Sequence, residues 1–317
     1  MKAKRYKSIT KWLKWLLIFF LLTIFPSPNT YFFPVKETKG LNFPEEIILP
    51  SPPPVPVQLN KIIPEVSAEG VLIKDLNSGF VLYSKNENIR YQPASTTKIM
   101  TALVSMDMFK PEEILTVKSV KQDGRVMGLQ INEKIISESL IYGILVHSAN
   151  DAAFTLAENF PGGIDKFVEK MNEKGKELGL ENTHFTNPAG FDDDKHYTTA
   201  ADLAKLAQIA LSKKYFAKIV GTRGITVSDV DYTYFHELKN VNELLGRIPG
   251  VAGVKTGFTQ TAGEILVTEV KKNGQSVLFV LLKSRDRFGE TKILIDWVFN
   301  NFIWQNITVP PSANQKL

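Results

Sequence analysis

Two β-hairpin signals enclose a long series of helical patterns, and this order constrains the fold of the 317-residue chain more than any other feature. Each hairpin consists of two apolar runs around a turn: 70–75 and 80–84 around Asn77-Ser-Gly79, and 264–270 and 276–282 around Asn273-Gly274. Helical periodicity covers 96–109, 137–147, 151–160, 164–178, 200–212 and 287–302. The two hairpins are expected to meet in one sheet, with the helices inserted between them.

We therefore predict a mixed α/β (α+β) domain. It has an antiparallel sheet of about five strands flanked by helices, and an inserted all-helical lobe. Thr199, with Asp202 three residues later, predicts a capped start for the helix over 200–212. The last helix is predicted to carry these residues on its apolar side: Ile293, Leu294, Trp297 and Phe302. A helical lobe of this kind leaves a cleft against the sheet, where we expect the functional site.

The N-terminal segment predicts export from the cytoplasm. Six Lys or Arg residues precede residue 15 without an acid, and mostly apolar residues follow over 15–25. This is typical of a cleaved signal peptide or of an uncleaved membrane anchor, and the sequence leaves both open. Ten of the 17 prolines lie within 26–64, which predicts an extended linker. We expect a folded domain over 65–304, a tail over 305–317, and a location at the extracytoplasmic face of the membrane or in the periplasm or cell-wall space.

Composition excludes several classes of function. The chain has no cysteine, so disulfides, cysteine nucleophiles and thiolate metal sites are excluded. The net charge of +5 is concentrated in the N-terminal segment, which argues against a nucleic-acid-binding surface. Four dispersed histidines are expected to have core or surface roles rather than catalytic ones: His147, His184, His196 and His236. We predict no metal and no cofactor.

Ser95 and Lys98 form the first motif that can carry chemistry. Pro93 disfavours helix just before them, and the apolar spacing of a helix begins just after them. Residues three apart share a face of a helix, so the Lys98 amine can approach the Ser95 hydroxyl and act as its base when it is uncharged. A helix-capping serine beside a solvated lysine fits the same spacing, and Ser8-Ile-Thr-Lys11 matches it as well.

Two further motifs make the set more specific. Ser148-Ala-Asn150 lies between two predicted helices, where a loop can present both polar side chains. Lys255-Thr256-Gly257 precedes the last hairpin, and a short strand there can line the edge of the cleft. Lysine offers a cation and threonine a hydroxyl, while glycine lets a ligand approach the backbone. Each motif alone is also compatible with a surface turn.

The ordered set S-x-x-K, S-x-N and K-T-G is the signature of penicillin-binding proteins and class A β-lactamases. On it, residues 65–304 resemble the D-alanyl-D-alanine carboxypeptidases, the low-molecular-mass penicillin-binding proteins. The resemblance includes Ala94–Leu103, Ser148–Ala153, Leu178–Gly190 and Gly253–Thr259. It implies a β-lactamase/transpeptidase-like fold and substrates that are peptidoglycan stem peptides ending in D-Ala-D-Ala. β-Lactams are implied as inhibitors, and membrane attachment would fall to the N-terminal segment.

The resemblance also implies a role for each motif residue. Ser95 would be the nucleophile and Lys98 its base, while Ser148 would move protons and Asn150 would hold the substrate. The terminal carboxylate would be bound by the third motif, which supplies these substrate-binding residues: Lys255, Thr256, Gly257 and Phe258. The backbone N–H groups of Ser95 and Phe258 would form the oxyanion hole.

Other activities on the same fold stay open. A D,D-endopeptidase acting on crosslinked peptidoglycan would use the same motifs, and a non-catalytic sensor of β-lactams or cell wall would retain them. A β-lactamase is disfavoured, because Glu177-Leu-Gly-Leu180 is followed by Glu181 where the class A deacylation motif has asparagine.

Overall fold

The computed structural model describes residues 52–60 and 62–306. The predicted signal or anchor, most of the linker and nearly all of the tail therefore lie outside the described residues. Within the described ranges, no helix is both long and apolar enough to cross a membrane.

The predicted antiparallel sheet is present, and its five strands run in the order β3-β2-β10-β9-β8. Their bounds are β2 (Gly70–Asp75), β3 (Val81–Lys85), β8 (Val251–Thr259), β9 (Gly263–Lys272) and β10 (Gln275–Ser284). The central strand β10 pairs with both β2 and β9, so it joins the two predicted hairpins, with Val280 opposite Leu72 and Val267. The turn between β9 and β10 places Asn273 and Gly274 at positive φ, as the Asn-Gly signal predicts.

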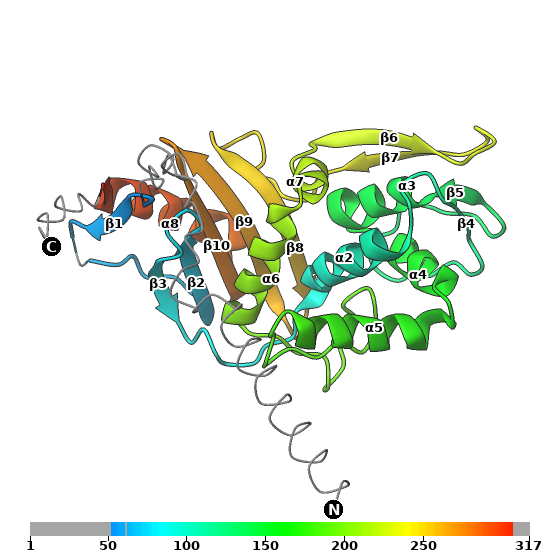
Figure 1. Cartoon of the computed structure of the whole chain (residues 1–317), viewed down its shortest axis with the longest axis horizontal. Helices are drawn as coiled ribbons and strands as arrows, with labels where there is room; N and C mark the ends of the chain where they lie inside the picture. Colours follow the sequence, from blue (N-terminus) through cyan, green and yellow to red (C-terminus); the bar gives the residue numbers. More distant parts are fainter. Residues whose placement is uncertain (1–51, 61, 307–317) are drawn as a thin grey trace, which may run out of the picture. The chain divides into compact units, whose positions relative to one another are not determined.

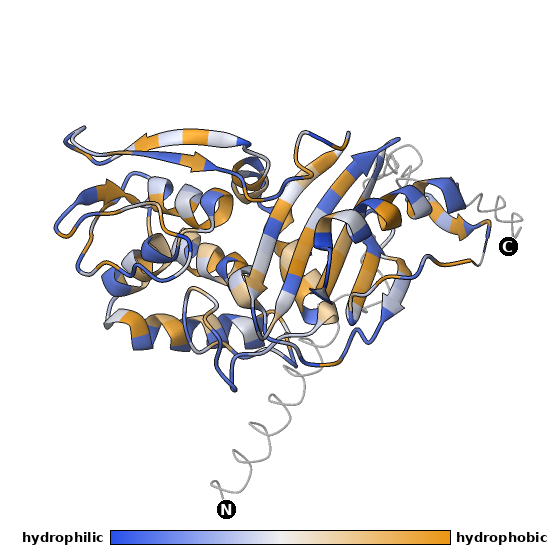
Figure 2. Ribbon diagram, turned by 180° about the vertical axis from the view of Figure 1, so that it is seen from behind, coloured by the Kyte–Doolittle hydropathy of each residue, from blue (hydrophilic) through white to orange (hydrophobic). Residues whose placement is uncertain are grey.

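Both faces of the sheet are buried, which explains why its strands read as nearly continuous apolar runs. Successive residues of β10 alternate between two cores: Leu278 and Val280 belong to the core shared with the helical lobe, and Val277 and Phe279 to the other. Helix α6 (Ala200–Ser212) packs on the first face and α8 (Arg287–Asn301) on the second. Figure 1 shows α6 in front of the sheet, and Figure 2, from behind, shows α8 in front.

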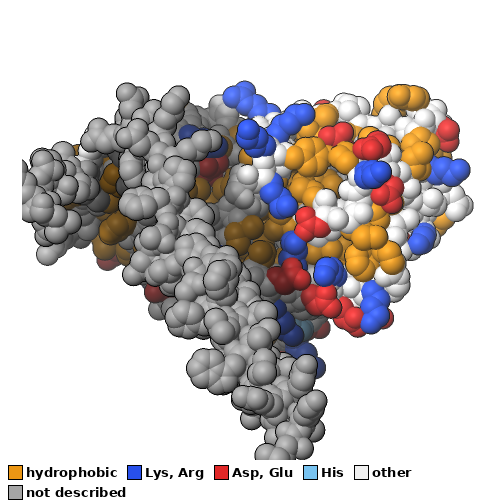
Figure 3. All heavy atoms as spheres, in the orientation of Figure 1, with side chains coloured by type: hydrophobic (Ala, Val, Ile, Leu, Met, Phe, Trp, Pro, Cys, Tyr) orange, Lys and Arg blue, Asp and Glu red, His pale blue; other side chains and the backbone are white. Residues whose placement is uncertain are grey.

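The helical lobe fills the chain between the two hairpins. Its helices are α2 (Lys98–Met108), α3 (Ser137–Tyr142), α4 (Asn150–Asn159), α5 (Gly163–Glu177) and α7 (Lys214–Val220). A 3₁₀ turn, η2 (Ala94–Thr97), precedes α2, and a π-helical turn, η3 (Gly143–His147), follows α3. Strand β8 forms the edge of the sheet nearest this lobe (Figure 1). Charges of both signs are interspersed over the face of the lobe in Figure 3. Lys174 and Lys213 both pair with Asp107.

Several local predictions were right. The Thr199 side chain accepts a hydrogen bond from the Asp202 backbone N–H, which caps α6 as expected. The last helix buries Leu294 and Trp297, but Ile293 is 49% exposed, so its assignment to the apolar side is wrong. Helix α7 and two small ribbons were not predicted. The ribbons are formed by β4 (Ile114–Thr116) with β5 (Lys134–Ile136), and by β6 (Gly224–Ser228) with β7 (Phe235–Lys239).

The end of the predicted linker is part of the fold. Strand β1 (Val55–Gln58) pairs antiparallel with β11 (Phe302–Gln305), and Val55 lies opposite Gln305 of the predicted tail. The folded part therefore begins before residue 65. Pro56 is accommodated because this ribbon has only two strands, and a proline without an N–H can sit in an edge strand.

Candidate active site

Ser95 and Lys98 are aligned by the 3₁₀ turn that begins the α2 segment. In a 3₁₀ turn, residues i and i+3 eclipse one another. The Lys98 Nζ lies 3.0 Å from the Ser95 Oγ. The turn is fixed by Thr96, whose hydroxyl donates to the Pro93 carbonyl over 2.6 Å. The predicted nucleophile and base are thus within hydrogen-bond distance.

Lys98 is fully buried, and its amine contacts two acceptors besides Ser95. Nζ lies 2.7 Å from the Asn150 Oδ1 and 2.7 Å from the Ala189 carbonyl. Burial lowers the pKa of Lys98 to about 7, although the nearby Asp151 carboxylate acts in the opposite direction. A neutral amine has two N–H bonds and one lone pair. With both N–H bonds given to Asn150 and Ala189, the lone pair faces the Ser95 hydroxyl.

Ser148 and Lys255 form a second pair. The π-helical turn η3 ends at Ser148, which has the left-handed conformation with φ 64°. Its Oγ lies 2.9 Å from the Lys255 Nζ, which also donates to the Thr256 carbonyl over 2.9 Å. Lys255 is 2% exposed. Burial, followed by the positive charges of neighbouring cations, holds the pKa of Lys255 well below its usual value.

The three motifs meet around one cavity of about 450 Å³. Lys98 and Asn150 connect the first motif to the second, and Lys255 connects the second to the third. The predicted site residues that line the cavity are Ser95, Ser148, Asn150, Thr256, Gly257 and Phe258. Lys98 and Lys255 lie behind this lining and reach the two serine hydroxyls from the interior.

Gly257 allows strand β8 to pass directly against the nucleophile turn. A Cβ at this position would lie 3.1 Å from the Ala94 Cβ and 3.3 Å from the Ser95 backbone nitrogen. Phe258 follows in the strand, and its side chain is 59% exposed at the cavity. The two N–H groups implied as an oxyanion hole therefore belong to segments in close contact.

Two cavity-lining cations, Arg125 and Arg287, were missed by the sequence analysis. Arg287 is the first residue of α8, and its Nη1 donates to the Gly257 carbonyl over 2.8 Å. Arg125 lies in the loop between β4 and β5, and its charge contributes to the lowered pKa of Lys255. Within the described part of the chain, no acid forms an ion pair with Arg125, Arg287 or Lys255. Glu264 also lines the cavity and its charge acts on Arg287, but positive groups outnumber negative ones there. The cavity therefore favours an anionic group such as a carboxylate.

A third missed residue, Asp151, is fully buried directly after Asn150. Its only sequence signal is its place beside the second motif. Among the residues that the structure describes, no group of three His, Cys, Asp or Glu side chains is arranged to hold a metal ion.

Comparison with known proteins agrees with this geometry. The family model for D-alanyl-D-alanine carboxypeptidase, peptidase S11, matches residues 57–286. The chain belongs to this family. The match spans all three motifs, Arg125 and Asp151, and it ends just before Arg287.

Relatives named for D-alanyl-D-alanine carboxypeptidase or endopeptidase activity are similar over most of this chain. D-alanyl-D-alanine carboxypeptidase DacF of Bacillus subtilis is 34% identical over 246 residues, which are 74% of this chain and 63% of the relative. A D-alanyl-D-alanine endopeptidase of Escherichia coli K12 is 33% identical over 72% of this chain and 74% of its own length. The chain spans less than two thirds of the Bacillus subtilis relative and of the Haemophilus influenzae carboxypeptidase DacA.

The solved structure of the Streptomyces K15 DD-transpeptidase has the same fold. It superposes with a TM-score of 0.71 at 29% identity, covering 75% of this chain and 99% of the transpeptidase. The predicted β-lactamase/transpeptidase-like fold is confirmed.

Proposed function

We propose that the chain is a serine-type D-alanyl-D-alanine carboxypeptidase, which removes the terminal D-Ala from peptidoglycan stem peptides through an acyl-enzyme. One observation carries the proposal: the buried Lys98 amine lies 3.0 Å from the Ser95 hydroxyl, beside a cavity lined by Arg125 and Arg287. Family membership supports the reaction class.

Acylation begins with the uncharged Lys98. As the Ser95 Oγ attacks the carbonyl carbon between the two D-alanines, its proton moves to the Lys98 Nζ and the new Oγ–C bond forms. The negative charge moves to the carbonyl oxygen, where the backbone N–H groups of Ser95 and Phe258 stabilise it. The C–N bond then breaks, and the leaving amine takes a proton from the Ser148 hydroxyl. Ser148 recovers a proton from Lys98, which leaves that amine uncharged for deacylation.

In deacylation, water is the attacking group and Ser95 is the leaving group. A water molecule attacks the ester carbonyl and gives a proton to Lys98. The Oγ–C bond breaks, and the proton returns to Ser95. The enzyme then releases a peptide shortened by one residue.

The cationic end of the cavity selects for a chain terminus. A free terminal carboxylate can pair with the cations at this end of the cavity, which are Arg125, Arg287 and Lys255. It can also accept a hydrogen bond from the Thr256 hydroxyl. The arrangement favours a substrate with a free carboxylate, because a substrate without one would leave these cations without a counterion.

The test is Ser95→Ala, measured by covalent labelling with fluorescent penicillin and by D-Ala release from an acylated peptide ending in D-Ala-D-Ala. We expect both signals to be lost, with the melting temperature retained. Ser105→Ala is the matched control, since Ser105 is a buried serine of α2, the helix that follows the Ser95 turn. Its hydroxyl has no hydrogen-bond partner among the described residues, so both signals should remain. Labelling of Ser95→Ala at the wild-type rate would refute the assignment.

The endopeptidase alternative is supported by the similar Escherichia coli protein, which is named a D-alanyl-D-alanine endopeptidase. It uses the same residues on a crosslinked substrate. A higher kcat/KM for cleavage of a crosslinked peptide dimer than for D-Ala release would assign the chain to the endopeptidase activity.

β-Lactams are proposed to acylate Ser95 in the same way as the substrate, because they also present a strained amide and a carboxylate to the cavity. Labelling by penicillin without D-Ala release would favour the sensor reading. Rapid turnover of nitrocefin would favour a β-lactamase.

We also propose that the protein acts outside the cytoplasm, held by or released from the membrane at residues 1–25. The basic and then apolar N-terminal sequence supports this. Cell fractionation tests the location, and N-terminal sequencing of the extracted protein distinguishes a cleaved signal from an anchor.

A further inference from the structure

The segment over 123–130 brings Arg125 to the cavity, and it is held in place from two sides. On the side of the active site, Asn150 contacts it twice. The Asn150 Nδ2 donates to the Asp123 carbonyl over 2.7 Å, and the Asn150 backbone N–H donates to the Arg125 carbonyl over 2.7 Å. Asn150 therefore makes hydrogen bonds both to the Lys98 amine and to this segment.

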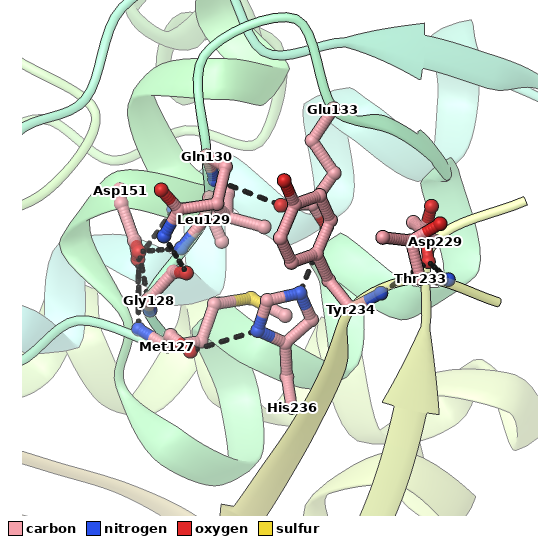
Figure 4. A network of polar contacts seen from close by, with 11 residues as sticks. Met127, Gly128, Leu129, Gln130, Glu133, Asp151, Asp229, Thr233, Tyr234 and His236 are labelled. Carbon is pink, nitrogen blue, oxygen red and sulfur yellow. Dashed lines mark hydrogen bonds and ion pairs between the residues drawn. The ribbon is translucent and has the colours of Figure 1, made fainter. Parts of the chain in front are cut away.

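The buried Asp151 carboxylate binds the second half of the same segment (Figure 4). Its oxygens accept hydrogen bonds from three successive backbone N–H groups, at 3.0 and 3.1 Å from Met127, 2.9 Å from Gly128 and 3.1 Å from Leu129. These bonds hold the backbone of Met127, Gly128 and Leu129 against the start of α4.

His236 of strand β7 holds the segment from the other side. The side chain is 5% exposed, and its two ring nitrogens lie against two different oxygens. Nδ1 is 3.0 Å from the Met127 carbonyl, and Nε2 is 2.8 Å from the Glu133 Oε1. The other Glu133 oxygen accepts the Gln130 backbone N–H over 2.8 Å. Figure 4 shows this chain of contacts running from β7 through Met127 to the Asp151 carboxylate.

The two oxygens facing the ring define its protonation. A carbonyl and an ionised carboxylate only accept hydrogen bonds, so both ring nitrogens donate when Glu133 is ionised. His236 is then an imidazolium. Burial alone would lower the pKa of His236, but the hydrogen bond and charge of Glu133, the Met127 carbonyl and the Asp151 charge outweigh it and raise the pKa above the ordinary value. Glu133 and Asp151 are the charged groups that act on the ring.

We propose that His236 is a positioning residue for the substrate carboxylate. By holding the Met127 carbonyl from strand β7, it fixes the 123–130 segment and thereby the place of Arg125 at the cavity. The inference rests on the proposed function, in which the cationic end of the cavity binds the terminal carboxylate. It assigns a role in substrate binding to a side chain that does not line the cavity.

Two conservative variants separate the contacts of the ring. The amide nitrogen of glutamine can take the place of Nε2 and keep the Glu133 contact, whereas that of asparagine can take the place of Nδ1 and keep the Met127 contact. We expect His236→Gln to raise the KM for a peptide ending in D-Ala-D-Ala about tenfold, with kcat within about twofold of wild type. His236→Asn should stay within about threefold in KM. A purely structural role would instead lower the melting temperature of both variants without this KM difference.

A double-mutant cycle tests whether His236 acts through Arg125. Arg125→Gln alone should raise KM about tenfold, and adding His236→Gln should raise it little further, because both changes remove the same contact with the carboxylate. Multiplication of the two effects, or an unchanged KM in His236→Gln, overturns the proposal.

Asn159→Ala is the matched control. Asn159 also holds backbone in the helical lobe, at 2.8 Å from the Thr116 carbonyl, but it lies at the opposite end of α4 from Asn150. It should lower stability and leave KM unchanged.

Hydrogen exchange makes the inference independent of the proposed reaction. Loss of protection at the Met127 and Leu129 amides in His236→Gln, but not in Asn159→Ala, shows that His236 fixes the segment even if D-Ala release is absent. Unchanged protection refutes the positioning role. Absence of D-Ala release and penicillin labelling from the wild-type protein refutes the proposed function instead.

Discussion

The pH dependence of acylation can be shifted by one substitution beside Lys98. The Asn150 Oδ1 lies 2.7 Å from the Lys98 Nζ, so Asn150→Asp places a carboxylate against the amine with little change in shape. The carboxylate stabilises the ammonium form, which cannot accept the Ser95 proton. The substitution therefore acts on the protonation state of the proposed base.

The expected magnitude follows from the pKa of Lys98, which is about 7 in the folded protein. At pH 7 about half of the amines are uncharged. An opposite charge at this distance raises a pKa by about 1–3 units. The uncharged fraction at pH 7 then falls to between roughly 10% and 0.1%, which lowers the acylation rate about 5-fold to 500-fold.

The direction in which the pH dependence of acylation shifts distinguishes this effect from simple damage to the site. Because the proposed base is the uncharged amine, the wild-type rate should rise with pH, tenfold per unit below about pH 7, and then reach a plateau. In Asn150→Asp the same rise should occur about 1–3 pH units higher. Much of the lost rate should therefore return at alkaline pH.

The assay is the second-order rate of labelling by fluorescent penicillin, measured across the pH range in which the enzyme remains folded. Asn150→Ala is the control, since it removes the same hydrogen-bond acceptor from Lys98 without adding a charge. We expect it to lower the rate without an alkaline shift. If the Asp and Ala variants lose rate equally at every pH, Lys98 is not the titrating base.

Two further substitutions test the scaffold of the site. Asp151→Ala leaves the N–H groups of Met127, Gly128 and Leu129 without their acceptor, so the free energy of unfolding in urea should fall by about 3 kcal/mol or more. The rise of acylation with pH should also move to lower pH, because Asp151 raises the pKa of Lys98; an unmoved profile contradicts this coupling. Gly190→Ala puts a Cβ into the Ala94 carbonyl at φ +90° and should cost roughly 2–4 kcal/mol. The control Gly79→Ala, at φ +79° with open space around it, should cost only about 1 kcal/mol, and equal losses would rule out the collision.

The fold was largely predictable because both hairpins and most helices are long and periodic. The ribbon of β6 and β7 was missed because its pattern is inverted: in β7, Phe235 is 64% exposed while His236 is buried. A polar residue inside and an aromatic residue outside hide the alternation on which strand prediction depends. Prolines similarly concealed β1, since proline predicts a linker unless the strand has a free edge.

Within the site, the separations inside each motif were predictable because they are local. Ser95 and Lys98 are joined by one turn, and no long-range packing is needed to place them on one face. The cation cluster is different. Arg125 and Arg287 are far apart in the sequence, and only the packing of the helical lobe against the sheet edge at β8 brings them to one cavity. Neither residue belongs to a pattern that sequence alone distinguishes from a surface arginine.

The helix that carries the proposed base Lys98 also contributes buried apolar residues to the core, and their burial compensates for the low pKa of the base. Lowering the pKa of Lys98 from 10.5 to about 7 corresponds to about 5 kcal/mol of free energy against the charged form. Because the unfolded chain binds this proton up to higher pH, the contribution of Lys98 to stability rises as pH increases from about 7 to 10.5, and the cost is fully present below pH 7. Ile99 and Leu103 on the same helix are fully buried, and each contributes about 1.5–3 kcal/mol of apolar burial. Burial of Ile99 and Leu103 thus offsets the free-energy cost of keeping the Lys98 amine uncharged, and the same residues hold the helix in place.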